Sequence, residues 1–248
     1  MKSRLSLLAA AALVTLCLPP FAQAAGKPED ELAAVIKTFY GKSFVTDWGV
    51  IVLRTGKPCR EGERQAHAAF YAAQRIPILG RIEPPGTVEA GDLVWLDSRT
   101  VLAGRGHRTN AAGIELLRAL LAPKGAEVIS APLPHGAGPA ACLHLMSLVS
   151  LLDEHTALVD LPLLSVETVE LLRARGFAFI EMHPTERETL ACNVSSLGER
   201  RLLALEENTL TNERLRAAGF IVRTFPGRDL AINGGGGPTC LTRPLLRA

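Results

Sequence analysis

The stretch GDLVWLDSRTVLAGRGHRTNAAGIELLRALLAPKGAEVISAPL, residues 91–133, decides the fold. It opens with two apolar runs around the polar turn LDSR, a pattern typical of a β-hairpin. An amphipathic helix follows, with Ile114, Leu117 and Leu121 at three- and four-residue spacing and a stop at Gly125. The apolar run AEVISAPL then supplies a third strand. The stretch therefore predicts one strand–strand–helix–strand (ββαβ) unit.

The same unit recurs loosely, with starts near Phe44, Asp92, His144 and Asn193. The turns LDEH and LGER repeat the hairpin signal, and two further helical patterns end at glycine. A single ββαβ unit cannot bury its own apolar faces, so such units must pack against one another. Polar groups at equivalent places in each unit are then expected to converge at a shared centre. Glu89, which precedes the second unit, His144 and Cys240, which follows the last unit, are placed to do so.

The composition bounds the class of protein. With 248 residues, of which 48% are hydrophobic, the chain can bury a core as one or two domains. The formal charge is +2, and without residues 1–24, which hold Lys2 and Arg4 and no acid, 25 bases balance 25 acids. A neutral chain disfavours nucleic acid or a strongly charged membrane surface as a partner and favours a small molecule or another protein.

Residues 1–24, MKSRLSLLAAAALVTLCLPPFAQA, have the basic, apolar and small-residue regions of a secretory signal. The apolar run Leu5–Leu18 is too short to span a bilayer, so no membrane span is expected. This interpretation predicts a secreted or periplasmic protein. The alternative is a misassigned start and a cytoplasmic protein.

The five cysteines are scattered and have no paired metal-binding spacing, so neither a metal nor another cofactor is expected. Reduced, buried thiols with one reactive exception are the simplest account. The exception is Cys240, which ends the run GGGGPTC (234–240). Glycines there let a substrate lie against the backbone beside a thiol. The leucines that follow Cys240 predict a strand returning to the core.

A thiol, an imidazole and a carboxylate can act as nucleophile, proton carrier and orienting partner. Each residue also has a simpler interpretation. His144 in LHLMS can be a core histidine of an apolar strand, Glu89 a turn carboxylate, and Cys240 an inert thiol. The charges of HPTERETL (183–190) are expected to form a solvated loop.

The motifs PGTVEAGD (85–92), GRGHRTN (104–110), LHLMS (143–147), CNV (192–194) and GGGGPTC resemble those of the guanidino-group-modifying enzymes. The chain is most similar to their dimethylarginine dimethylaminohydrolase branch, and the corresponding domain is taken as residues 38–248. The resemblance implies an α/β fold, a pseudo-fivefold α/β propeller of ββαβ modules. About four modules are recognisable here and the first is reduced.

By this resemblance Cys240 is the nucleophile, His144 the proton shuttle and Glu89 its carboxylate partner. Arg60 and Arg108 would bind the α-carboxylate of the substrate, for which the planar guanidinium fork is suited. Arg60 can equally be a solvated residue at a helix start, and Arg108 can belong to a helix cap.

The family also places a guanidinium-binding aspartate in an F-x-x-D motif. One alignment assigns this role to Asp47, and a gapless alignment puts Gly41 at that place and makes Asp47 a turn residue. Arginine deiminases carry an aspartate two residues after the histidine, where this chain has Met146. The loss of that carboxylate is compatible with a methylated substrate.

The sequence thus predicts a hydrolase of an arginine derivative that works through a covalent thiouronium on Cys240. Two alternatives stay open: a truncated or divergent relative without activity that binds guanidino compounds or nothing, and a deiminase or amidinotransferase of another linear amidine. The expected partner is a small guanidino substrate. A homodimer also stays open.

Overall fold

The structure, a computed structural model, describes residues 43–57, 60, 62–141 and 143–241. All of them belong to one compact unit, Ile36–Ala248. The predicted signal, residues 1–24, lies outside the described residues, and so do Gly41, Cys59 and Cys142. Among the described helices none is both long and apolar enough to cross a lipid bilayer.

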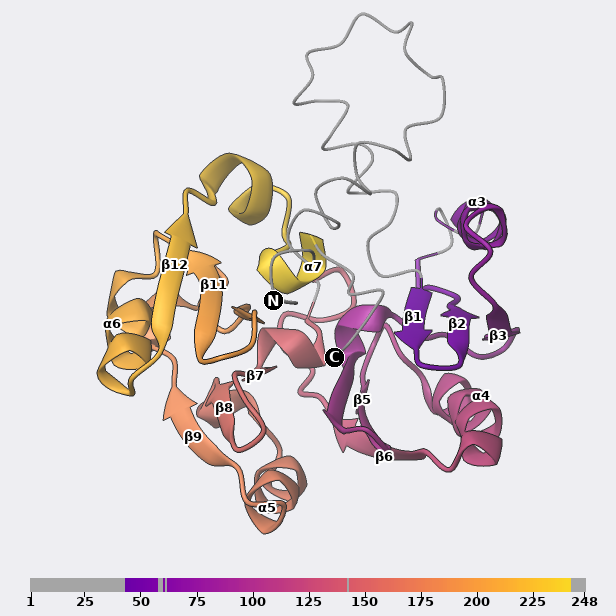
Figure 1. Cartoon of the computed structure of the whole chain (residues 1–248), viewed down its shortest axis with the longest axis horizontal. Coiled ribbons are helices and arrows are strands. Elements are labelled where there is room, and N and C mark those ends of the chain that lie inside the picture. Colours follow the sequence, from indigo (N-terminus) through magenta and orange to yellow (C-terminus); the bar gives the residue numbers. More distant parts are fainter. Residues whose placement is uncertain (1–42, 58–59, 61, 142, 242–248) are drawn as a thin grey trace, which may run out of the picture. The chain divides into compact units, whose positions relative to one another are not determined.

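Within residues 43–241, the described part of the chain, four ββαβ modules follow one another (Figure 1). Module 1 consists of β1 (Ser43–Thr46), β2 (Gly49–Val52), α3 (Glu63–Ala73) and β3 (Ile78–Arg81). Module 2 consists of β4 (Leu93–Asp97), β5 (Thr100–Arg105), α4 (Ala111–Leu121) and β6 (Glu127–Pro132). Module 3 consists of β7 (Val149–Leu151), β8 (Thr156–Val159), α5 (Val166–Ala174) and β9 (Ala178–Glu181). Module 4 consists of β10 (Ser195–Ser196), β11 (Arg201–Leu205), α6 (Thr209–Ala217) and β12 (Ile221–Phe225), and the short helix α7 (Pro238–Leu241) follows it.

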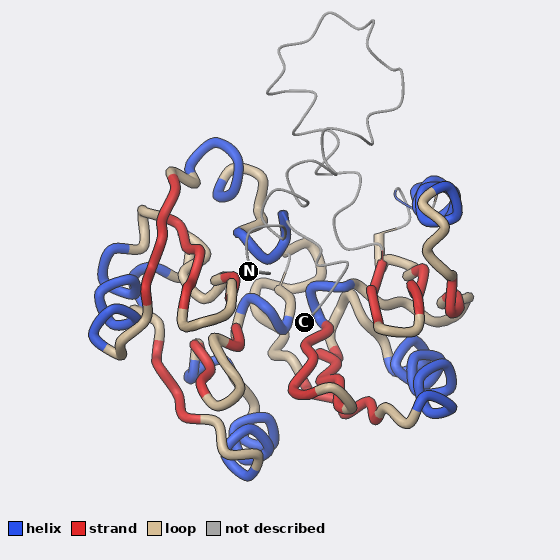
Figure 2. Tube along the Cα trace, viewed as in Figure 1, coloured by secondary structure: helices blue, strands red, loops and turns tan. Residues whose placement is uncertain are grey.

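Each module has its own three-stranded sheet with the second strand in the middle. In module 2, β4 runs antiparallel to β5 with Val94 opposite Leu102, and β5 runs parallel to β6. The parallel step requires a crossover, which α4 provides. Figure 2 shows the helices α3 to α6 on the outer side of the strands. The predicted ββαβ unit and the α/β propeller architecture are confirmed.

Local signals set the helix boundaries. α4 begins after Asn110, whose Oδ1 accepts a hydrogen bond from the amide of Gly113 at 2.8 Å. Three of the helices are followed by a glycine at positive φ, at Gly125, Gly176 and Gly219. A residue without a Cβ adopts this left-handed conformation without strain, which explains why these helices stop where the sequence predicts.

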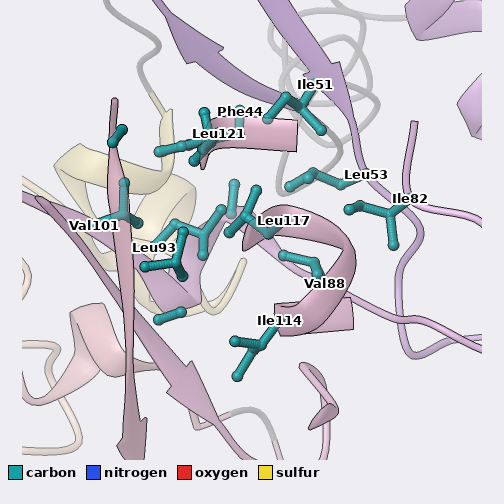
Figure 3. Packing of buried hydrophobic residues seen from close by; sticks show 14 residues of the cluster. Phe44, Ile51, Leu53, Ile82, Val88, Leu93, Val101, Ile114, Leu117 and Leu121 are labelled. Carbon is teal, nitrogen blue, oxygen red and sulfur yellow. The ribbon is translucent and has the colours of Figure 1, made fainter. Parts of the chain in front are cut away.

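The core joins each module to the next, because the two faces of a sheet pack on different neighbours. Along β5, Val101 and Ala103 lie in a cluster shared with module 1, whereas Leu102 lies in a cluster shared with module 3. A third cluster joins modules 3 and 4. Figure 3 shows the first cluster, where Leu117 of α4 packs among side chains from both modules. Complete burial of one such leucine contributes about 1.5–3 kcal/mol to the free energy of folding.

Two strand predictions are wrong. His144 precedes a 3₁₀ turn, Leu145–Ser147, and the strand β7 begins only at Val149. Leu241, the first of the leucines after Cys240, lies in the helix α7, whose first residue is Pro238. Proline has a preset helical φ and needs no amide donor, so it favours a helix start at this place. Leu245 and Leu246, which were also assigned to that strand, lie outside the described residues.

The prediction that the charges of residues 183–190 are simply solvated is also wrong. The carboxylate of Glu186 is buried and accepts hydrogen bonds from the amides of Leu210 and Thr211, both at 2.8 Å. It thereby satisfies amides at the start of α6 that have no partner within the helix. Arg187 makes two hydrogen bonds to the buried carboxylate of Asp160.

Candidate active site

The candidate site is built from segments that immediately precede the first strands of modules 2, 3 and 4. Glu89 lies before β4, His144 before β7 and Asn193 before β10. The repeat therefore places one polar side chain at an equivalent point of three successive modules. Cys240 reaches the same region from α7, after the last module.

Glu89 and His144 form a buried pair. Their side chains meet at 2.9 Å, between Oε2 of the carboxylate and Nε2 of the ring, and the residues are only 6% and 4% exposed. The other carboxylate oxygen, Oε1, accepts a hydrogen bond from the amide of Gly56 at 3.2 Å. Burial by itself raises the pKa of Glu89, but the hydrogen bond and charge of His144, the charge of Arg108 and the Gly56 amide outweigh it, so the pKa lies below its ordinary value. The carboxylate is therefore ionised, as a partner of an imidazolium must be.

A second carboxylate holds the segment that carries His144. Asp92 Oδ1 accepts from the amide of Leu145 at 3.0 Å, and Oδ2 accepts from the hydroxyl of Thr109 at 2.6 Å. Burial raises the pKa of Asp92 to about 6, against the opposing effects of His144 and these hydrogen bonds. These contacts give Asp92 a structural role, because its carboxylate fixes the backbone next to His144.

Gly91 lets the imidazole pack against the backbone. A Cβ at this position would lie 2.8 Å from both Cγ and Nδ1 of His144. Real Cβ atoms essentially never make contacts that short, so any other residue would displace the ring. The motif GTVEAGD thus supplies the ring with a hydrogen-bond partner at Glu89 and a packing surface at Gly91, and Asp92 supplies a carboxylate that accepts from the Leu145 amide.

The thiol of Cys240 is held by a residue that the sequence analysis did not single out. Asn193 Nδ2 donates to Cys240 Sγ at 3.1 Å. Asn193 could have been found as the polar residue at the start of the fourth repeat, equivalent to His144 in the third. Cys240 is partly exposed, whereas burial raises the pKa of the Cys192 thiol, which donates to the carbonyl of Leu158. Of these two described cysteines, only Cys240 is placed to react with a solute.

A cavity of ≈ 320 Å³ lies where the first strands of all four modules face one another. Its lining includes Ala90, Met146 and Thr239, which are close neighbours in sequence of Glu89, His144 and Cys240. Each of the three predicted catalytic residues thus lies within two sequence positions of a residue that lines this cavity. A larger, more open hollow of ≈ 510 Å³ lies along β6 and is lined by none of the predicted site residues.

The predicted substrate-binding residues lie in different settings. Arg108 is buried, its Nη2 donates to the carbonyl of Ala141 at 3.3 Å, and its Nε has no hydrogen-bond partner within the described part of the chain. Arg60 is partly exposed and pairs with Glu63 at 3.1 Å at the start of α3. Asp47 lies in the exposed turn between β1 and β2 and makes no hydrogen bond or ion pair with a described residue. This position corresponds to the gapless alignment, in which Asp47 is a turn residue.

The profile of the arginine deiminase family matches residues 42–175 and 162–247 of the chain. An uncharacterized protein of Aeropyrum pernix is 30% identical over 199 residues, which is 79% of this chain and 66% of that protein. The N(G),N(G)-dimethylarginine dimethylaminohydrolase of Streptomyces coelicolor is 35% identical over 135 residues, covering 54% of this chain and 46% of that enzyme. The chain thus spans between about half and two thirds of the length of these relatives.

A solved structure shows the same fold. The dimethylarginine dimethylaminohydrolase of Pseudomonas aeruginosa, crystallised as a mutant in complex with citrulline, superposes with a TM-score of 0.66 at 25% identity. The match covers 86% of this chain and 77% of that one.

Proposed function

The chain belongs to the arginine deiminase family of guanidino-group-modifying proteins, and on that premise we propose that it hydrolyses an arginine derivative at the guanidino carbon. The product would be a ureido compound such as citrulline, together with an amine. One observation supports this most. The buried Glu89–His144 pair and the thiol of Cys240 come from distant parts of the sequence, and a sequence neighbour of each of the three residues lines the same cavity.

In the first half of the reaction the Cys240 thiolate forms a bond to the guanidino carbon. The bond from that carbon to the leaving nitrogen breaks, and the amine takes a proton from the His144 imidazolium. A covalent thiouronium on Sγ remains. A guanidinium carbon is a poor electrophile, but the cationic substrate favours the thiolate beside it by direct charge attraction.

In the second half the now neutral His144 removes a proton from water, and the hydroxide attacks the thiouronium carbon. The carbon–sulfur bond breaks and the thiolate of Cys240 is restored. The hydroxyl proton passes to solvent, where the released amine takes up a proton, and the neutral ureido product leaves. Glu89 stays ionised throughout, holds the orientation of the ring and stabilises its charged form. Each proton that His144 gives to the amine is thus regained from water.

The residues that line the cavity favour one class of substrate. Met146 contributes an apolar surface to the cavity where family deiminases carry a carboxylate. A methylated guanidinium loses hydration at its methyl groups and packs favourably there. Arg108, which is buried and has an unpartnered Nε within the described part of the chain, is the candidate for the substrate α-carboxylate. N-methylated arginine is therefore the proposed substrate class.

The test is product formation by the purified full chain from dimethylarginine, arginine and agmatine. We expect ureido product from dimethylarginine, loss of turnover in Cys240→Ser, and wild-type turnover in the matched variant Cys192→Ala. Intact-protein mass spectrometry during turnover should show the thiouronium adduct on Cys240. The absence of ureido product from all three compounds, or full turnover in Cys240→Ser, would rule the proposal out.

A second candidate is a relative that binds guanidino compounds without turning them over. The exposed position of Asp47 favours it, because Asp47 then does not supply the guanidinium-binding carboxylate that the F-x-x-D alignment assigns to it. Calorimetric titration with dimethylarginine separates the two: binding without any product supports this candidate, and turnover refutes it.

A further inference from the structure

We propose that Asn193 is a positioning residue that aims the Cys240 sulfur and stabilises its thiolate form. The inference rests on the role proposed above for Cys240. It is carried by three hydrogen bonds at the Asn193 amide and by the packing around it.

The orientation of the amide follows from its partners. Asn193 Oδ1 accepts from the backbone amide of Thr239 at 3.0 Å and from the hydroxyl of Thr239 at 2.7 Å. A backbone N–H can only donate, so the oxygen of the asparagine must face Thr239. Nδ2 then faces Cys240, where it lies 3.1 Å from Sγ.

The amide is held rigidly. Asn193 is buried and lies between the core residues Cys192 and Val194. A Cβ on Gly237 would lie 2.7 Å from Cγ and Oδ1 of Asn193, so only a glycine fits at that position. The donor is therefore fixed before any substrate arrives, and no reorganisation is needed when negative charge forms on sulfur.

A donor aimed at sulfur distinguishes the two protonation states of the thiol. An N–H group bonds more strongly to a charged acceptor than to a neutral one, so it favours S⁻ over S–H. The same bond limits the directions in which Sγ can point. The glycine run 234–237 thus has a second role besides leaving room for the substrate. Because Gly237 has no Cβ, the Asn193 side chain can pack against its backbone.

The experiment measures alkylation of Cys240 by iodoacetamide in the full chain, between pH 6 and 10, with peptide mass spectrometry to isolate this thiol. Two variants are compared. Asn193→Ala removes the donor and both acceptor bonds to Thr239. Asn193→Asp keeps an acceptor for Thr239 but places a negative oxygen beside sulfur. We expect alkylation near neutral pH roughly tenfold slower in Asn193→Ala and slower still in Asn193→Asp, with both rate–pH profiles moved to higher pH.

The order of the two variants decides between positioning and a merely structural role. If Asn193 only braced the loop, Asn193→Ala, which loses more hydrogen bonds, would be the more disturbed variant and the pH profile would not move. The matched controls are Asn208→Ala and Asn208→Asp, because Asn208 is also buried in module 4 and also bonds a threonine, Thr189. These should alkylate at the wild-type rate.

Wild-type alkylation profiles in both Asn193 variants, or Asn193→Asp faster than Asn193→Ala, would overturn the proposal. Should Asn193→Asp fail to fold, the comparison of Asn193→Ala with Asn208→Ala decides, and equal rates count against the proposal. The readout needs no substrate. A chain that forms no ureido product but shows the expected order of alkylation rates would refute the proposed function and leave the role of Asn193 intact.

Discussion

Glu89 and His144 are 55 residues apart in the sequence, yet their side chains share a hydrogen bond of 2.9 Å in the interior of the protein. A buried carboxylate is tolerated because it is paired and accepts a further bond from Gly56. The pair therefore forms only when two modules pack together. Substitution of either residue tests the proposed chemistry directly.

Glu89→Gln should lower kcat for ureido formation by about 10²–10⁴-fold with a small change in KM, since a neutral amide cannot stabilise the imidazolium. Steady-state kinetics with dimethylarginine provides the measurement. Glu115→Gln, at an exposed position on α4, is the matched control and should retain wild-type kinetics. A wild-type kcat in Glu89→Gln would contradict the assigned role.

Gly91→Ala should reduce kcat sharply, because the added methyl group would displace the His144 ring. The overpacking should also lower the free energy of unfolding by about 1–3 kcal/mol. Gly62→Ala is the control, since its Cβ would meet no heavy atom of a described residue within 4 Å and its φ of −63° suits any residue. Denaturant titration and kinetics of both variants test this, and unchanged turnover in Gly91→Ala would exclude a catalytic ring at this place.

Arg108→Lys should raise KM for dimethylarginine and arginine by roughly tenfold or more, because lysine cannot pair both oxygens of a carboxylate. Any turnover of agmatine, which has no carboxylate, should change little. The ratio of kcat/KM values for arginine and agmatine in wild type and variant is the measurement. An equal loss of kcat/KM for both compounds would mean that Arg108 does not bind the substrate carboxylate and instead affects Glu89 or the stability of the fold.

Asp92 should make the protein less stable as the pH rises from about 4 to 6. Its pKa is raised from 3.8 to about 6, so the folded state holds the proton over a range in which the unfolded state has lost it. A shift of that size corresponds to at most about 3 kcal/mol in the free energy of unfolding.

Glu89, whose pKa is lowered, contributes in the opposite sense: its stabilisation is present at neutral pH and is lost on acidification. The Asp92 effect is therefore read as the difference between wild type and Asp92→Asn in urea titrations at several pH values. That difference should change across pH 4–6, and parallel stability curves for the two proteins would contradict the assignment.

The helices and hairpins were predictable because their signals are local. A polar turn between apolar runs, Ile114, Leu117 and Leu121 on one face, and a glycine after the helix are all read within one repeat. The position of Glu89, His144 and Cys240 along the chain suggested convergence. Asn193 was named as the start of a repeat and within the motif CNV, but without a role, since a lone asparagine carries no local sign of what it faces.

The sequence by itself determined the ββαβ repeat, the positions of its glycine stops and the order of an acid, an imidazole and a thiol along the chain. Only the tertiary structure decided which atoms meet: the Glu89 carboxylate with His144, the Asn193 amide with the Cys240 sulfur, and Asp47 in an exposed turn. The physical reason is the separation along the chain of the residues that interact. Backbone conformation follows from neighbours within a few residues, whereas these contacts join residues about fifty positions apart and exist only once the modules share their cores.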